Sequence, residues 1–313
     1  MTISEHGGHI KGPAEVLRTN MVDVGELRDS AARGRATELA VQGKPVGLYN
    51  VAVSAILGDG KNRAFVDAVA TIKGEKRGQR PLAACLPTER FVEILDPEKI
   101  SESLHAKFLD ARDLAARTGS LCFFRAPITE VAAETLPPSM VSRLDGVPVI
   151  QNWDATGHQP TNLLLAQMRN AGIEYPAITS MNVSGQPEIV DQHEAIQFSQ
   201  EHGLPIFLTD EKTNPHVVGS YTILELNQSG LKLLRAGNIP VDMLRIVLDT
   251  PINTDGSTQA KSAIPLSIPD EEMDELKTLD PKTARIAILS ALRDEPFPNL
   301  DKVLGRDQKN SST

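Results

Sequence analysis

The stretch TSMNVSGQP, residues 179–187, places hydroxyl side chains, an amide and a glycine directly after a short apolar run. Three interpretations are open for it: a solvent-facing turn, a glycosylation acceptor, or the wall of an anion site. Ser180 and Asn182 point to the same side if the preceding strand persists that far. Both side chains can donate hydrogen bonds to phosphate oxygens, and Gly185 gives the turn flexibility. The Asn182–Ser184 sequon is a chance match unless the chain is secreted.

A second polar stretch, IKGEKRGQRP at residues 72–81, concentrates positive charge around two glycines. Alone it is typical of a solvated basic turn. It is also suited to phosphate, because Lys and Arg neutralise phosphate charge and glycines let backbone N–H groups approach an anion. Its basic residues are Lys73, Lys76, Arg77 and Arg80.

Composition limits the class of protein. The chain has 313 residues, of which 40% are hydrophobic, enough for one large domain or a domain with an appendage. The net charge of -9 disfavours binding of polyanions by overall charge, although a local basic patch remains open. Aromatic residues make up 4%, so a broad stacking surface for single-stranded nucleic acid is not expected.

The same sequence predicts a cytoplasmic protein with no membrane contact. No apolar run follows a basic N-terminal segment, so no signal peptide is expected, and no apolar stretch is long enough to span a bilayer. Cys85 and Cys122 lie in apolar segments and are expected to be buried free thiols. His6 and His9 have a metal-like spacing, but no further ligand lies nearby and a mobile terminus is the simpler interpretation.

Helical patterns alternate with short apolar runs, which predicts an α/β fold with an open, twisted, mixed sheet flanked by helices. We expect a flexible arm over residues 1–24, the main domain over 25–245, and a linker with a C-terminal helical extension over 246–313. Helices are predicted over 25–42, 62–74, 101–118, 162–172, 193–203 and from Asp280, and strands over 44–57, 81–86, 119–128, 146–153, 175–182, 204–211 and 220–226.

Two familiar catalytic motifs fail on inspection. GDGK, residues 58–61, resembles the end of a phosphate-binding P-loop, but Asn62 replaces the required Ser or Thr. No Gly-x-Ser-x-Gly nucleophile elbow is present. His158, near Trp153 and Asp154, is open to two interpretations, a residue facing a pocket or a loop histidine without a chemical role.

The order of the motifs resembles the YrdC-like family of threonylcarbamoyl-adenylate synthases over about residues 30–240. Each segment is weakly specific alone, and the resemblance depends on their order and spacing. The matching segments are IKG at 72–74, RPL at 80–82, GSLCFFRAP from Gly119, SMNVSG at 180–185, TILEL from Thr222, and LLRAGNI with Arg235 and Gly237.

The first loop departs from the family pattern. That loop normally reads Pro-Thr-Asp-Thr-x-Tyr-Gly-Leu, whereas residues 49–56 read YNVAVSAI. Asn50 keeps a polar group, and Ser54 stands where the tyrosine is expected. The side that contacts the amino acid in the family is therefore largely replaced.

The basic residues differ less from the family pattern than the first loop does. Glu75 stands where the family's Lys-x-Arg pair has its arginine, so that Lys76 or Arg77 would serve instead. Gln151 stands at the arginine of a later strand. The basic and Ser/Asn side of an anion site persists.

The resemblance implies condensation of threonine, bicarbonate and ATP into threonylcarbamoyl-adenylate and pyrophosphate, with Mg²⁺ accompanying the triphosphate, as a step in tRNA modification. Such chemistry needs positioning and charge stabilisation more than acid–base groups, so no catalytic residue is assigned. The implied nucleotide-binding residues are Lys73, Lys76, Arg77, Ser180, Asn182, Ser184 and Arg235, and the implied substrate-binding residues are Asn50, Ser54 and Thr222.

Three functions remain open on the sequence. The chain is a divergent synthase that adenylates a carbamate, with an amino acid other than threonine as one option. Alternatively, it is a non-catalytic YrdC-like domain that binds a nucleotide, tRNA or double-stranded RNA. A third hypothesis is an accessory protein that interacts through the C-terminal segment.

Overall fold

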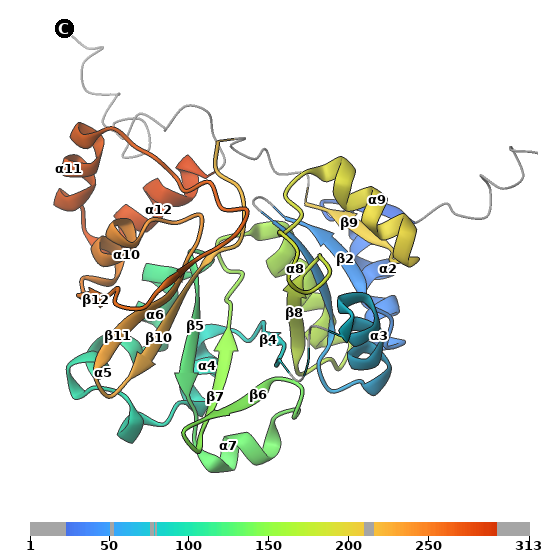
Figure 1. Ribbon diagram of the computed structural model, residues 1–313, viewed down its shortest axis with the longest axis horizontal. Coiled ribbons are helices and arrows are strands. Elements are labelled where there is room, and N and C mark those ends of the chain that lie inside the picture. The colour runs from blue at the N-terminus through green and yellow to red at the C-terminus, as the bar shows by residue number, and fades with distance from the viewer. Residues whose placement is uncertain (1–22, 51–52, 76–77, 79, 210–215, 293–313) are drawn as a thin grey trace, which may run out of the picture.

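The computed structural model describes residues 23–50, 53–75, 78, 80–209 and 216–292. Within these residues, thirteen strands form one mixed sheet in the order β1-β9-β2-β3-β8-β4-β7-β5-β10-β11-β12, with β13 beside β11 and β6 beside β7. In Figure 1 the sheet divides into two halves on either side of the short strand β4. One half contains β1 (Val24–Glu26), β2 (Val46–Tyr49), β3 (Ser54–Asp59), β8 (Pro176–Ser180) and β9 (Ile206–Leu208). The remaining strands are β4 (Ala83–Ala84), β5 (Cys122–Pro127), β6 (Val141–Leu144), β7 (Val147–Asn152), β10 (Thr222–Asn227), β11 (Gly230–Ala236), β12 (Ile252–Asn253) and β13 (Thr258–Gln259).

Helices cover both faces of the sheet and bury two sets of apolar side chains. The smaller set, which includes Leu57, packs with α2 (Ser30–Val41) and α8 (Gln159–Asn170). The larger set, which includes Ile56, packs with the other helices. Ile56 and Leu57 face opposite sides because side chains alternate along a strand. The other helices are α3 (Arg63–Lys73), α4 (Thr88–Ile94), the 3₁₀ helix η3 (Pro97–Lys99), α5 (Glu102–Phe108), α6 (Ala111–Thr118), α7 (Glu130–Thr135), α9 (Gln192–His202), α10 (Val241–Leu248), α11 (Asp270–Thr278) and α12 (Pro281–Ala291).

Local signals in the sequence set several helix ends. The Asn62 side chain accepts a hydrogen bond from the first turn of α3, and Asp280 does the same for α12, which has Pro281 at its first position. Helix α3 ends at Gly74, whose φ of 72° lies in the region that favours glycine. The ends at Gly74 and Asp280 confirm the sequence prediction, and the capping role of Asn62 is an addition from the structure.

Two predicted helices have different limits in the structure. The helix expected over 25–42 begins only at Ser30, because Asp29 caps it and the preceding residues pair with β9 as strand β1. The helix expected over 101–118 is divided into α5 and α6. Asp110 accepts hydrogen bonds from the backbone N–H groups of Arg112 and Asp113, which starts a new helix there.

Two further segments contain a larger number of strands than the sequence predicts. The run 44–57 forms an antiparallel pair, β2 with β3, whose register ends at Tyr49 opposite Ser54. The polar segment 250–269 contains β12 and β13, both parallel to β11, and leads to the unpredicted helix α11. Helix α12 packs against α6 and α10.

At the centre of the sheet, the Asn152 side chain adds hydrogen bonds to those of the short strand β4. Strand β4 has two residues, with Ala84 opposite Ala177 of β8 on one side and Asn152 of β7 on the other. Beyond β4, the buried Asn152 amide accepts a hydrogen bond from the Leu86 N–H at 2.8 Å and donates to the Leu86 carbonyl at 3.1 Å. The Asn152 side chain thus continues the hydrogen bonding of the sheet where the backbone of β4 ends.

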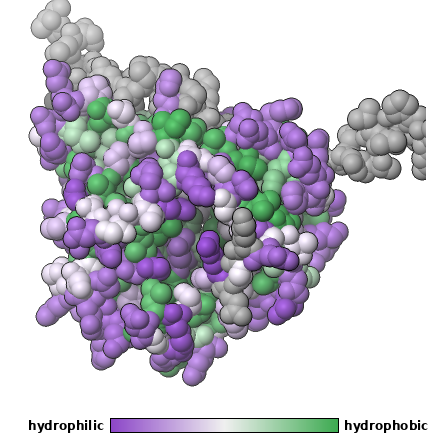
Figure 2. Space-filling view, in the orientation of Figure 1, coloured by the Kyte–Doolittle hydropathy of each residue, from purple (hydrophilic) through white to green (hydrophobic). Residues whose placement is uncertain are grey.

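Hydrophilic residues cover most of the molecular face seen in Figure 2, and the surface is hollowed near its centre. In the described part of the chain, no helix has the length and apolar character needed to cross a bilayer.

Replacement of Gly237 by alanine is expected to destabilise the fold. A Cβ at Gly237 would lie 2.2 Å from the Ser220 carbonyl oxygen and 2.4 Å from the Thr222 nitrogen, both backbone atoms that cannot rotate away. Overpacking of this kind costs about 1–3 kcal/mol or more, which thermal unfolding measures.

Gly34→Ala is the matched control. Gly34 lies within α2, where the nearest foreign atom to a new Cβ is 3.6 Å away, so this change is expected to stabilise the protein by about 0.5–1 kcal/mol. Equal effects of the two substitutions would contradict the steric argument.

Candidate functional site

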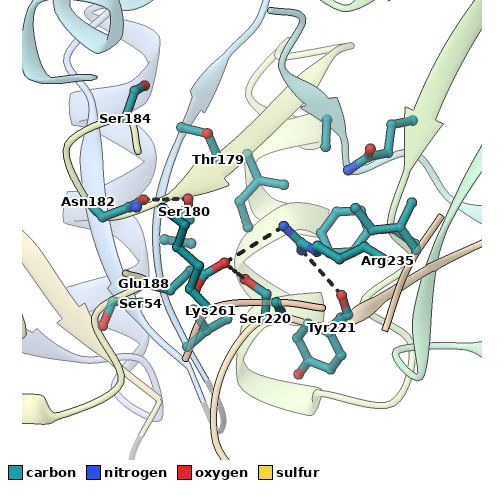
Figure 3. Close-up of a pocket in the computed structure, with 18 of the residues that line it drawn as sticks. Ser54, Thr179, Ser180, Asn182, Ser184, Glu188, Ser220, Tyr221, Arg235 and Lys261 are labelled. Atoms are coloured by element: carbon teal, nitrogen blue, oxygen red, sulfur yellow. Dashed lines mark hydrogen bonds and ion pairs between the residues drawn. The ribbon is translucent and has the colours of Figure 1, made fainter. Parts of the chain in front are cut away.

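A cavity of about 430 Å³ lies over the middle of the sheet, between its two halves. Its residues come from β3, β4 and β8 on one side and from β5, β7, β10, β11 and β13 on the other. The segments that follow α3, β8 and β13, and those that precede β3 and β10, complete the lining. Its volume falls within the range of small-molecule sites. Figure 3 shows hydroxyl, amide and charged side chains converging on this cavity from both halves.

The first wall is built around Lys73, the last residue of α3. Its side chain is buried, and its ammonium donates to the Ser180 carbonyl at 2.6 Å, to the Ser180 hydroxyl at 3.1 Å and to Asn182 Oδ1 at 2.8 Å. The Ser180 hydroxyl also donates to Asn182 Oδ1 at 2.6 Å. Ser180 and Asn182 therefore come together as predicted, although not by alternation along a strand, because β8 ends at Ser180 and Asn182 lies in the loop that follows.

The loop after β8 is closed by further hydrogen bonds. Asn182 Nδ2 donates to the Gln186 carbonyl at 2.7 Å, and the Ser184 N–H donates to the Lys73 carbonyl at 2.9 Å. Gly185 turns the chain with φ of 89°. TSMNVSGQP is thus a structured loop that lines the cavity and is fastened to α3.

The opposite wall centres on Glu188 and Arg235. Glu188 Oε1 accepts a hydrogen bond from the Ser220 hydroxyl at 2.8 Å and lies 3.7 Å from Arg235 Nη1. Arg235 also donates to the Tyr221 carbonyl at 3.3 Å. Ser262 closes the group, since its N–H donates to Glu188 Oε2 at 3.3 Å and its hydroxyl to the Glu188 carbonyl at 3.0 Å.

The charges of this wall are set by burial and by these contacts. Burial raises the pKa of the Glu188 carboxyl, but its own backbone N–H, Ser220, Arg235 and Ser262 outweigh burial, so that pKa lies below its ordinary value. Burial lowers the pKa of the Arg235 guanidinium, and Glu188 opposes that change. The Glu188 carboxyl is therefore ionised at neutral pH, and a guanidinium keeps its proton in proteins because its ordinary pKa is so high.

An aromatic cluster supports the second wall. Phe123, Trp153 and Tyr221 line the cavity, with ring centroids 5.7–6.3 Å apart. The buried His158 ring lies within hydrogen-bonding distance of the Tyr221 hydroxyl, 2.8 Å from Nε2 to oxygen. His158 itself does not line the cavity, and its chemical role stays open.

The structure brings most of the sequence-predicted site residues together. Seven of them line the cavity: Lys73, Ser180, Asn182, Ser184, Arg235, Asn50 and Ser54. Lys76 and Arg77 lie outside the described residues. Their roles in binding stay predictions.

Thr222 is placed elsewhere. Its side chain is fully buried, and its hydroxyl donates to the Ile239 carbonyl at 2.6 Å and accepts from the Gly237 N–H at 3.0 Å. Ile223, the next residue in β10, lines the cavity instead, because neighbouring side chains of a strand face opposite sides. A role of Thr222 in substrate binding stays an untested prediction.

Sequence reasoning missed several lining residues. Arg80 belongs to the basic stretch but was not assigned to the site, and Lys261, which donates to the Gly185 carbonyl at 2.5 Å, comes from a segment expected to be a linker. Glu188 gave no signal, because a lone glutamate after a loop is usually solvated. Its position three residues after Gly185 was the available clue.

A metal site formed by protein side chains alone has no support in the described residues, which contain no group of three or more His, Cys, Asp or Glu side chains placed to hold an ion. A Mg²⁺ ion that arrives with a triphosphate uses phosphate oxygens and water as its main ligands. That Mg²⁺ accompanies a bound triphosphate stays a prediction.

Acid is expected to remove the stabilising contribution of Glu188. Because the folded-state pKa of its carboxyl is depressed, the charge stabilises the fold fully above the ordinary pKa of about 4.3 and loses that effect as the pH falls through the lower folded-state value. Glu188→Gln should therefore destabilise the protein more at pH 7 than at about pH 3. Chemical unfolding at both pH values measures this, and a difference that does not depend on pH contradicts it.

Comparison with known proteins supports the fold and leaves the activity open. No protein-family profile matches the chain, and no curated protein sequence is significantly similar to it. Two solved structures of P. abyssi Sua5 are similar at 17% identity, the complex with L-threonine with a TM-score of 0.55 over 77% of this chain and a doubly substituted variant with 0.54 over 72%. The chain spans 67% and 63% of these two proteins, respectively.

A third similar structure, the hypothetical protein smu.1377c from Streptococcus mutans UA159, has a TM-score of 0.53 and 11% identity, and the match covers 77% of this chain and 99% of that one. At such identities the likeness concerns the arrangement of strands and helices alone. That arrangement is the one expected from the order of the sequence motifs, and this chain has a YrdC-like fold.

Proposed function

We propose that the cavity binds a nucleoside triphosphate, with ATP as the first candidate, and that its phosphates lie against the wall formed by Lys73, Ser180, Asn182 and Ser184. The observation that carries this proposal is that wall: a buried ammonium, hydroxyls and an amide gathered at the end of a strand beside an open cavity. Arg80 and Lys261 add positive charge to the lining. Positive charge attracts phosphate oxygens. A phosphate that contacts Lys73 or Ser180 directly replaces one of the hydrogen bonds that these side chains make to each other or to Asn182.

The bound nucleotide is proposed to react with a carbamate formed from an amino acid and bicarbonate. A carbamate oxygen attacks the α-phosphorus, the bond to the bridging oxygen breaks, and pyrophosphate leaves with that electron pair. The cations of the lining stabilise the charge that develops on the phosphates, and the walls align the two reactants. Mg²⁺ is proposed to accompany the triphosphate and share this charge.

The identity of the amino acid remains part of the proposal. One of the similar Sua5 structures was solved with L-threonine, which supports threonine as a first candidate. In this chain, the buried Asn50 and Ser54 face the cavity where the family pattern has a richer set of polar groups. An amino acid that is less polar than threonine suits such a wall better. The product would serve in tRNA modification in the cytoplasm.

Binding is tested by calorimetry with a non-hydrolysable ATP analogue, with and without Mg²⁺. Arg80→Ala is expected to weaken binding about tenfold, because a charge-assisted contact to phosphate is lost. The matched control is Arg112→Ala, since Arg112 is exposed on α6 and does not line the cavity. Absence of binding by the unmodified protein would remove the proposal.

Catalysis is tested by pyrophosphate release with ATP, bicarbonate and a panel of amino acids that includes threonine. Release that requires both bicarbonate and one amino acid is the expected result. Release without any amino acid identifies an uncoupled ATPase, and nucleotide binding without release identifies a non-catalytic binding domain. Retention of tRNA or double-stranded RNA that falls steeply with salt would favour the alternative of an RNA-binding domain.

A further inference from the structure

The charged residues of the cavity are unevenly distributed. Among the described residues that line it, Lys73, Arg80, Arg235 and Lys261 are basic, and Glu188 is the acidic one. A cavity built only to attract polyphosphate gains nothing from a carboxylate inside it. Glu188 therefore calls for an explanation in terms of ligand choice.

Glu188 is held in place from several directions. Its side chain is 10% exposed, and its oxygens receive the Ser220 hydroxyl and the Ser262 N–H. Its backbone is fixed as well, because Ser262 donates to the Glu188 carbonyl and the Ser54 N–H donates to the carbonyl of Ile189. Figure 3 shows the carboxylate between the Ser180–Asn182 loop and Arg235.

The position of this carboxylate changes what Arg235 can bind. Its Oε1 lies 3.7 Å from Arg235 Nη1, so the protein already supplies the guanidinium with a negative partner. A ligand phosphate that approached Arg235 would lie within a few ångströms of Glu188. Like charges at that distance in a partly buried site repel by more than a single charge-assisted hydrogen bond contributes.

We propose that Glu188 is a specificity-determining residue that excludes phosphate from the Arg235 end of the cavity and reserves this end for an uncharged hydrogen-bond donor, such as a hydroxyl. The carboxylate accepts from the Ser220 hydroxyl and the Ser262 N–H and, with about four acceptor positions, has capacity for a ligand donor. The inference deepens and rests on the proposed function, because it orients a nucleotide: phosphates toward Lys73, an uncharged part toward Glu188.

A double-mutant cycle with inorganic pyrophosphate as the probe tests this inference. Glu188→Gln keeps the shape of the side chain and is expected to tighten pyrophosphate binding about tenfold, because it frees the guanidinium for a phosphate. Arg235→Met in the unmodified protein is expected to change affinity less than about twofold. Arg235→Met in the Glu188→Gln background should abolish the whole gain.

The controls distinguish the effect of removing a carboxylate inside the cavity from the effect of removing one outside it. Glu225→Gln also removes a carboxylate paired with an arginine, Arg125 at 2.6 Å, but outside the cavity lining, and should leave pyrophosphate affinity unchanged. Glu188→Asp keeps the charge and should not reproduce the gain. Circular dichroism verifies folding, and Arg235→Gln replaces Arg235→Met if the latter does not fold.

Each result decides the inference. No gain with Glu188→Gln, or a gain that survives Arg235→Met, overturns it. If the unmodified protein binds the ATP analogue but Glu188→Gln brings no gain, the inference fails and the proposed function stands. If the ATP analogue does not bind but Glu188→Gln acquires pyrophosphate binding lost with Arg235→Met, the proposed function fails and the role of Glu188 stands.

Discussion

The cavity depends above all on the burial of the Lys73 ammonium. Removing an ammonium from water is costly, and the cost is offset only when its protons find acceptors. Here, the Ser180 carbonyl and hydroxyl and Asn182 Oδ1 supply them, and the position at the carboxyl end of α3 suits a positive charge. The loop after β8 is therefore shaped around this one group. Because the chain then runs directly to Glu188, the second wall also takes its position from this loop.

The two walls differ in how their charges are satisfied. In the first wall, the cation donates to neutral oxygens of Ser180 and Asn182. The second wall pairs its cation with a carboxylate and adds aromatic side chains. The two ends of the cavity therefore differ in the partners that the protein gives to their cations. An asymmetric site of this kind can orient a ligand that has a charged part and an uncharged part.

Much of the fold could be predicted from local sequence. Gly74, Asn62 and Asp280 mark helix ends by their own chemistry, and short apolar runs indicated the strands of an α/β sheet. The motif order led to the correct fold because spacing along a chain restricts topology. Elements whose identity depends on partners were missed: β1 is a strand only because β9 lies beside it, and Asp110 divides a pattern that otherwise reads as one helix.

The site was predictable to the extent that its residues are close in sequence. Ser180 and Asn182 are two residues apart, and Lys73 belongs to a conspicuous basic stretch, so all three could be assigned to one wall. The pairing of Glu188 with Arg235 brings together distant segments, which a single sequence does not reveal. The placement of Thr222 depends on strand parity, and one residue of difference turns a side chain from the cavity into the core.

The two-residue strand β4 has a mechanical consequence. Few backbone hydrogen bonds cross the middle of the sheet there, and the Asn152 amide adds two more, so the halves meet along a narrow seam. The cavity lies directly over this seam, with one wall on each half. A ligand that contacts both walls therefore links the two halves of the sheet. Its binding free energy stabilises the folded state at the place where few backbone hydrogen bonds connect them.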